Sequence, residues 1–160
     1  MSMWPWSNTR WSLLGRIDAA AVEAAIARAE ARTTGEIRVS VAGFFRGDLR
    51  RLAERAFRRL GMVATRHRNG VLILVAPTRR QLVILGDQGI HAHVGEAFWS
   101  VLTDKLSARF HNQEFTAGLI EAIEHIGGEL AAHFPPVPGG DVNELSDAVD
   151  VAQRSDSGQL

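Results

Sequence analysis

One uninterrupted apolar segment constrains the fold of this chain more than any other feature of its sequence. Residues 71–76 read Val-Leu-Ile-Leu-Val-Ala, without a polar side chain. A strand exposed on one face alternates apolar and polar residues, whereas a strand this apolar is typical of a sheet covered on both faces. The segment therefore predicts an α/β fold, in which helices flank a central sheet on both sides.

The flanking segments supply the other elements of the predicted fold. Residues 36–41 alternate in polarity and predict a half-buried strand, and residues 81–85 predict a strand that returns beside 71–76 as an antiparallel hairpin. Right-handed crossover makes the first two strands parallel. Apolar residues at helical spacing predict four helices, at about 19–32, 49–60, 95–109 and 116–133. The predicted order is α-β-α-β-β-α-α, around a mixed sheet of three to four strands.

The chain divides into three predicted parts. Residues 1–16 contain three tryptophans, which either pack on the domain surface or form an aromatic patch for a partner. Residues 17–135 form the α/β domain, and Pro135 and Pro136 end its last helix. Residues 136–160 carry five acidic side chains and one basic one, with few large apolar residues, so we expect this tail to be largely disordered.

The composition excludes several classes of function. Eighteen basic residues balance eighteen acidic ones, so the net charge predicts neither a nucleic-acid partner nor an anionic membrane. The absence of cysteine excludes disulfides and thiolate sites, and Lys105 is the only lysine that could form a Schiff base. No apolar run approaches the ~20 residues of a spanning helix, and residues 1–12 lack the features of a signal peptide. We expect a cytoplasmic protein.

The predicted topology brings three polar residues to one edge of the sheet. Glu36 begins the first strand, Asn69 directly precedes the second and Asp87 follows the third, which runs in the opposite direction. His67 and His91 are expected beside them. Carboxylate and amide oxygens among glycine-containing loops are ligands for a hard cation such as Ca²⁺ or Mg²⁺, and they could also orient a water for hydrolysis. A plainer interpretation is that these residues cap turns and strand ends.

Several segments, taken together, resemble the TPM domain family, and most closely its small cytosolic bacterial branch. The resemblance covers about 17–135 and rests on segments 34–39, 68–76 and 85–90, followed by Phe98-Trp99, Phe110 and 118–120. It implies a mixed sheet flanked by helices. It also implies binding of a divalent metal, calcium above all, and an acid phosphatase activity suggested for plant relatives. No nucleophile motif, P-loop or dinucleotide fingerprint accompanies it, so the catalytic residues stay unknown.

Basic side chains occur where the family often has acidic ones. The loop before the second strand reads Arg66-His67-Arg68-Asn69, which favours a bound anion or a protein carboxylate over calcium. Five arginines also cover the polar face of the helix at 49–60, which is typical of a solvated face. The acidic tail could fold over these arginines and mask them.

Three functions therefore remain open. The first is a binding module that holds a divalent cation at Glu36, Asn69 and Asp87, and the second is a phosphoric ester hydrolase that uses the same edge with a metal-activated water. The third is an adaptor that contacts an unknown protein partner through the tryptophan-rich start or the acidic tail.

Overall fold

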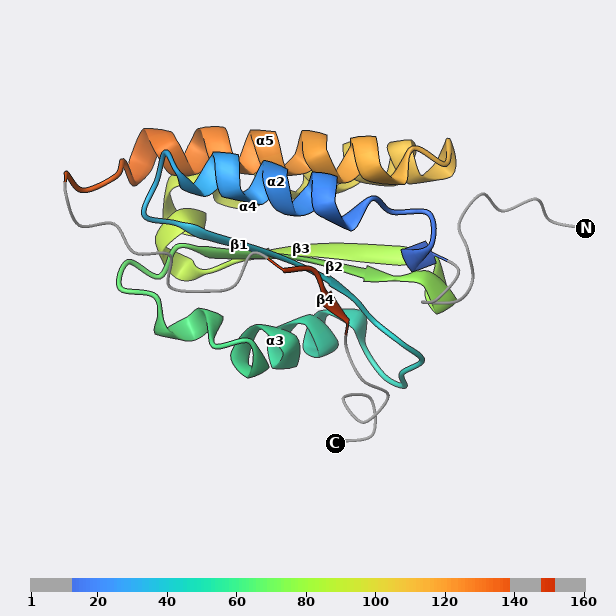
Figure 1. Cartoon of the computed structure of the whole chain (residues 1–160). Coiled ribbons are helices and arrows are strands. Elements are labelled where there is room, and N and C mark those ends of the chain that lie inside the picture. Colours follow the sequence, from blue (N-terminus) through green and yellow to red (C-terminus); the bar gives the residue numbers. More distant parts are fainter. Residues whose placement is uncertain (1–12, 139–147, 152–160) are drawn as a thin grey trace, which may run out of the picture.

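The computed structural model describes residues 13–138 and 148–151. Its elements follow one another in the predicted order, with one strand added at the end (Figure 1). They are α2 (Ala19–Glu30), β1 (Glu36–Val41), α3 (Leu49–Arg59), β2 (Gly70–Ala76), β3 (Gln81–Gly86), α4 (Gln88–His111), α5 (Phe115–His133) and β4 (Asp150–Val151). Two short 3₁₀ turns, Met62–Ala64 and Pro77–Arg79, precede and follow β2.

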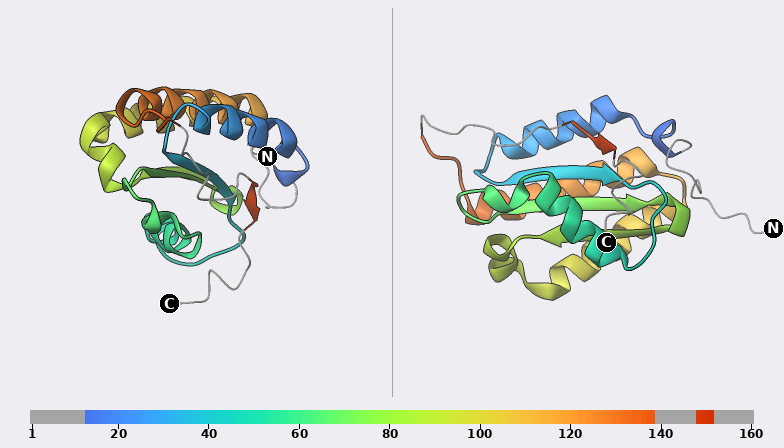
Figure 2. Two further views of the ribbon diagram at one scale, coloured as in Figure 1. Left: turned by 60° about the vertical axis from the view of Figure 1, so that its left-hand side comes forward. Right: turned by 90° about the horizontal axis from the view of Figure 1, so that it is seen from below.

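The four strands form one mixed sheet in the order β3-β2-β1-β4. β1 and β2 run parallel, with Glu36 opposite Gly70, and α3 connects them as the crossover predicted. β2 and β3 form the predicted antiparallel hairpin, with Val71 opposite Gly86. β4 runs parallel to β1 along its outer edge (Figure 2, right).

Helices cover the sheet on both faces, as the apolar segment 71–76 predicted. Every residue of β2 is buried. Its odd-numbered side chains join a core with α2, α4 and α5, and its even-numbered apolar side chains join a second core with α3. Figure 1 shows this arrangement, with α2, α4 and α5 on one side of the sheet and α3 on the other.

The first two helices each begin directly after an aspartate that caps them. The carboxylate of Asp18 accepts a hydrogen bond from the Ala21 amide at 3.1 Å, and that of Asp48 accepts one from the Arg51 amide at 3.2 Å. Each bond satisfies one of the amides that a helix leaves without an internal partner. Asp48 therefore sets where α3 begins, and with it the face that α3 turns to the sheet.

The start of α4 corrects the sequence-based prediction. A loop was predicted for residues 86–94 and a helix from Gly95, but α4 begins at Gln88 with Asp87 as its N-cap. The conformation of Gly95 is non-helical, with φ of 78° and ψ of 171°, so α4 consists of two helical segments that meet at a kink, and the second begins where the helix was predicted. The segment from Gln88 to the kink was missed because an aspartate between glycines signals a turn and a helix start equally well.

The C-terminal tail, which was predicted to be largely disordered, contributes one short strand. Residues 150–151 form β4, because backbone pairing with β1 stabilises a segment whose own composition favours disorder. Residues 139–147 and 152–160 of the tail, and the tryptophans Trp4, Trp6 and Trp11, lie outside the described residues. Within the described ranges, no helix is both long and apolar enough to cross a membrane.

Candidate functional site

The structure places Glu36, Asn69 and Asp87 at the same end of the sheet. The amide of Glu36 donates to the Asn69 carbonyl at 3.4 Å, and the amide of Asp87 donates to the Gly70 carbonyl at 2.9 Å. All three side chains are buried or nearly so. Two carboxylates and one side-chain amide therefore belong to neighbouring strands at this end of the sheet.

Asp87 already has a cationic partner in this arrangement. Its two carboxylate oxygens accept hydrogen bonds from Nε and Nη2 of Arg68 at 2.7 and 2.9 Å, and one of them also accepts from the Gln88 amide at 2.8 Å. The hydrogen bond to Asp87, and then its charge, raise the pKa of Arg68 above its ordinary value. Arg68 has a φ of 51°, a conformation uncommon outside glycine, asparagine and aspartate.

Side chains of the α3 layer separate Glu36 from Asp87. Strand alternation directs Glu36, like Arg38 and Ser40, to the α3 side of the sheet, and Asp87 borders a shallow pocket on that side next to Phe57. Gly70 lies between them in the sheet. A β-carbon on Gly70 would stand 3.4 Å from both Phe57 and the Met62 side chain, so these two residues cover the space between the carboxylates.

Asn69 is held by the turn that precedes β1. Its Nδ2 donates to the Thr34 hydroxyl at 3.1 Å, and its backbone amide donates to the Thr65 hydroxyl at 3.3 Å. The side chain is fully buried, and no described residue donates a hydrogen bond to its Oδ1. Asn69 thus links the start of β2 to the turn before β1 through a hydrogen bond. Its Oδ1 receives no hydrogen bond from a described residue.

Comparison with known proteins identifies the family. Residues 10–129 match the model of the TPM domain, which is three quarters of the chain. The chain belongs to the TPM domain family. Its match overlaps the region from which the resemblance was drawn, and the mixed sheet with flanking helices that the resemblance implied is the fold observed.

Two solved structures are similar to this TPM domain. One is the NMR structure of BA42 from the psychrophilic bacterium Bizionia argentinensis, with 35% sequence identity, a TM-score of 0.77, and coverage of 84% of this chain and 92% of that one. The other is the N-terminal domain of cg2496 from Corynebacterium glutamicum, with 17% identity, a TM-score of 0.55 and coverage of 77% and 76%, and it supports the fold alone. No curated protein matches the sequence.

The divalent cation that the resemblance implies does not fit the TPM domain as its side chains stand. The Arg68 guanidinium holds both oxygens of Asp87, and Phe57 and Met62 lie between Asp87 and Glu36. Over the described ranges, no group of three or more histidine, aspartate or glutamate side chains is arranged to hold a metal ion. A cation at Asp87 would have to displace the guanidinium first.

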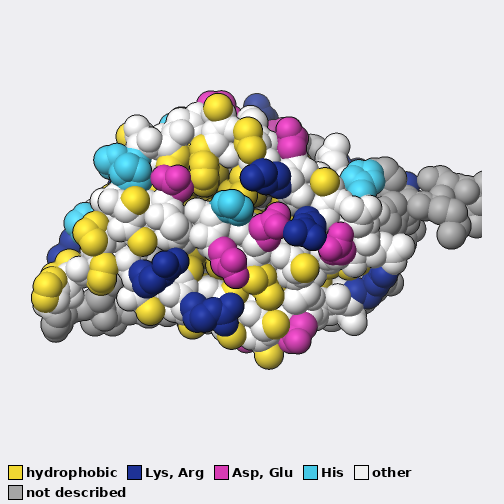
Figure 3. Space-filling view, turned by 90° about the horizontal axis from the view of Figure 1, so that it is seen from above, with side chains coloured by type: hydrophobic (Ala, Val, Ile, Leu, Met, Phe, Trp, Pro, Cys, Tyr) yellow, Lys and Arg dark blue, Asp and Glu magenta, His cyan; other side chains and the backbone are white. Residues whose placement is uncertain are grey.

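The histidines near this end of the TPM domain have separate surroundings. His91 Nδ1 accepts a hydrogen bond from Trp99 Nε1 at 3.0 Å. His93 instead stacks on His133 with 4.2 Å between ring centroids, and the Phe134 ring lies 5.5 Å from His93 and 6.1 Å from His67. Figure 3 shows histidine side chains at the end of the molecule where α5 ends. Two histidines two residues apart point differently because they lie on a helix, not on a strand.

Sequence reasoning missed part of this end of the TPM domain. From the sequence, His93, His133 and Phe134 were not singled out as residues of this site. No local signal could have joined them, because His93 and His133 lie on different helices and meet only when α4 and α5 pack together. Arg66 and His67 are exposed and precede Arg68 in the same loop.

Proposed function

We propose that this TPM domain is a non-catalytic binding module whose sheet end takes a ligand by an anionic group, a carboxylate or a phosphate. One observation carries the proposal. Arg68 occupies the position at Asp87 where a metal ion was expected, so the cation of this site is a residue of the chain itself. A site with a resident cation attracts anions.

The geometry of the pair supports presentation of Arg68 to a ligand. Asp87 uses Nε and Nη2 and leaves the two N–H groups of Nη1 outside the pair. The Arg68 side chain is 42% exposed, whereas that of Asp87 is 8% exposed, so the guanidinium lies on the solvent side of the carboxylate. Exposed Arg66 and His67 add two further hydrogen-bond donors from the same loop. The buried carboxylate thus acts as a positioning group for a guanidinium that can contact a ligand.

A paired titration tests this function. Metal-stripped protein should show NMR shifts in the backbone amides of 66–69 and 87–89 on addition of inorganic phosphate, with a dissociation constant on the order of 1 mM, typical of a small anion held by a few charged donors. Arg68→Ala should abolish these shifts because it removes the central donors. Arg50→Ala is the matched control, since Arg50 is an exposed arginine on α3 and should leave the response unchanged.

Calcium added to the same samples distinguishes anion binding from cation binding at this site. Wild-type protein should not respond at Asp87 below millimolar calcium, whereas Arg68→Ala should, because that substitution releases a buried carboxylate. A wild-type calcium response at Asp87, without a phosphate response, would overturn the anion proposal.

Cation binding at Glu36, Asn69 and Asp87 stays a prediction and is the second candidate function. The observation that favours it is the buried Oδ1 of Asn69, which no described residue satisfies and which a cation or a water could. The metal-assisted phosphatase requires this cation, so hydrolysis of p-nitrophenyl phosphate with and without Ca²⁺ or Mg²⁺ tests it. A metal-dependent rate above background that Asp87→Asn abolishes would support the hydrolase.

A further inference from the structure

The outer edge of β1 holds a segment of the chain's own tail. β4 pairs with β1 over two residues only, with Ser40 opposite Asp150 and Val41 opposite Val151. An edge strand presents backbone groups that can pair with another extended segment. The fold therefore already uses this edge to bind an extended peptide.

The backbone pattern defines which groups of β1 face outward. The amides of Glu36 and Ala42 donate to carbonyls of Asn69 and Val75, on the β2 side. Alternation along the strand turns the amides of the odd-numbered residues 37, 39 and 41 toward the outer edge. The first of these, the Ile37 amide, donates to the carboxylate of Glu30 on α2 at 2.7 Å. Along the outer edge of β1, the Ile37 amide therefore binds the Glu30 carboxylate, and residues 40–41 pair with β4.

The carboxylate of Asp150 lies in a site built from two elements. One of its oxygens accepts hydrogen bonds from the Ser40 hydroxyl and from Arg59 Nη2, each at 2.8 Å, and Ser40 is fully buried. Burial alone would raise the pKa of Asp150, but the hydrogen bonds from Arg59 and Ser40 and the charges of Arg59 and Arg38 outweigh it, so the pKa is lowered. The site therefore favours a carboxylate in its anionic form, and the predicted contact between tail and α3 arginines is confirmed at Arg59.

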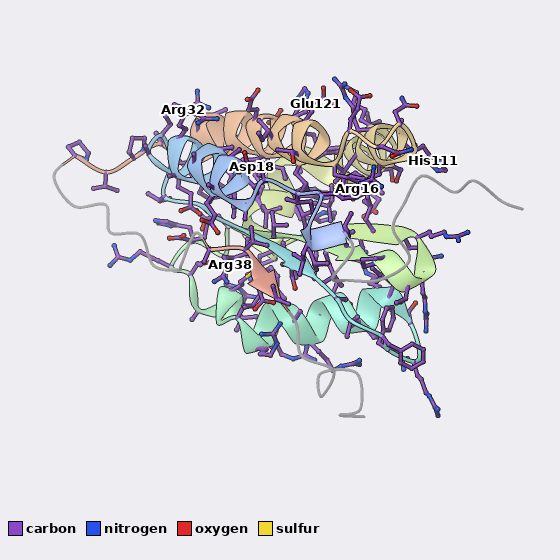
Figure 4. The ribbon with its side chains drawn as sticks, turned by 45° about the vertical axis from the view of Figure 1, so that its right-hand side comes forward. Arg16, Asp18, Arg32, Arg38, His111 and Glu121 are labelled. Carbon is purple, nitrogen blue, oxygen red and sulfur yellow. The ribbon has the colours of Figure 1, made fainter. Side chains whose placement is uncertain are left out.

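Arg38 supplies a second position in this site, where its charge acts on Asp150 but no described residue of the tail accepts a hydrogen bond from its Nε. It lies two residues before Ser40 and therefore on the same face of β1, and only 8% of it is exposed. Figure 4 labels Arg38 near β4. None of the described residues accepts a hydrogen bond from its Nε. The register that sets Ser40 opposite Asp150 brings position 148 level with Arg38, and alanine has no side-chain acceptor there.

A further arginine on α3 has the same unmet donor. The Nε of Arg55 is buried and no described residue accepts from it. Arg55 lies one helical turn before Arg59 and therefore on the same side of α3. An extended segment with more than one carboxylate would match these guanidinium groups better than the tail does, since the paired part of the tail brings the single carboxylate of Asp150.

We propose that the outer edge of β1 is a recognition site for an extended acidic segment of a partner protein, with carboxylates two residues apart that bind at Arg38 and at Ser40 with Arg59. Residues 148–151 are the resident occupant of this site and compete with the partner. A two-residue strand is short, so its occupancy depends on its attachment to the same chain, which supplies an effective concentration of about millimolar. A partner segment that fills both carboxylate positions displaces it.

Synthetic peptides test this site on the full chain. One peptide repeats the tail, Ser-Asp-Ala-Val-Asp-Val, and the second replaces its alanine with glutamate; a third carries glutamine there as a neutral control. Against protein with Asp150→Asn, which loosens the resident tail, the glutamate peptide should bind about tenfold more tightly than the alanine peptide, because it gains a hydrogen bond to a charged group. Amide shifts should occur at 37–41 and near Arg59.

Two variants of the protein decide the role of the arginines. Arg38→Gln should remove the tenfold preference while both peptides still bind, and Arg59→Gln should weaken both peptides and keep the preference. Arg38 is buried, so thermal unfolding must first show that the Arg38→Gln variant folds. If that variant does not fold, Arg59→Gln still tests the site, because Arg59 lies at the surface. Equal affinity for the glutamate, glutamine and alanine peptides, or no shift along β1 at millimolar peptide, would overturn the proposal.

Discussion

Replacement of Gly89 by alanine is expected to lower the free energy of unfolding by about 3 kcal/mol or more, which is the range of severe overpacking. A β-carbon at this position would stand 2.1 Å from the His67 carbonyl oxygen and 2.6 Å from that of Arg68. Both atoms belong to the backbone and cannot rotate away. The Gly89 amide also donates to the Arg68 carbonyl at 2.8 Å, so the loop must stay close to α4.

Gly89→Ala is also expected to alter the candidate site. The loop that would have to move carries Arg68, whose guanidinium holds Asp87. The variant should therefore lose the phosphate response as well as stability. Urea denaturation measures the first effect, and NMR titration measures the second.

Gly128→Ala is the matched control for this experiment. Both glycines lie within helices, but a β-carbon at Gly128 meets no atom within 4 Å. Alanine there should raise the free energy of unfolding by about 0.5–1 kcal/mol, the usual gain over glycine in a helix. If Gly89→Ala were as stable as Gly128→Ala, the close packing of α4 on the 66–69 loop would be contradicted.

Leu130→Ala and Gly35→Ala are expected to destabilise the fold separately and to compensate each other in part. Leu130 on α5 is fully buried, and its truncation should cost about 2–5 kcal/mol. A β-carbon on Gly35 would stand 2.7 and 2.9 Å from the two terminal carbons of that same leucine, so Gly35→Ala should cost about 1–3 kcal/mol by overpacking. The cavity left by Leu130→Ala would accept the added methyl group.

A double-mutant cycle measures the compensation. The two residues are in contact, so the double variant should be more stable than the sum of the single effects predicts, by about 1 kcal/mol. Urea unfolding of all four proteins supplies the values. Strict additivity would show that Leu130 does not pack on the turn that enters β1, and would remove one of the contacts that fix the end of the sheet.

Local patterns in the sequence determined most of the fold. The alternation of 36–41 and the apolar run of 71–76 specified the two parallel strands, and Asp18 and Asp48 specified where two helices begin. These features are readable because each depends on the side chain and on its near neighbours in the chain. The predicted topology also places Glu36, Asn69 and Asp87 at one end of the sheet, because strand order and direction alone determine that position.

Tertiary structure decided what those residues contact. Asp87 pairs with Arg68, nineteen positions earlier, and Ser40 bonds to Asp150, one hundred and ten positions later. No periodicity encodes such pairs, because which cation reaches a carboxylate depends on loop conformation and on competing contacts of similar energy. Phe57 and Met62 likewise close the space beside Gly70 only once α3 packs on the sheet. The sequence alone therefore determined the elements and their order, whereas the cation at Asp87 and the occupant of the β1 edge were decided only by packing in three dimensions.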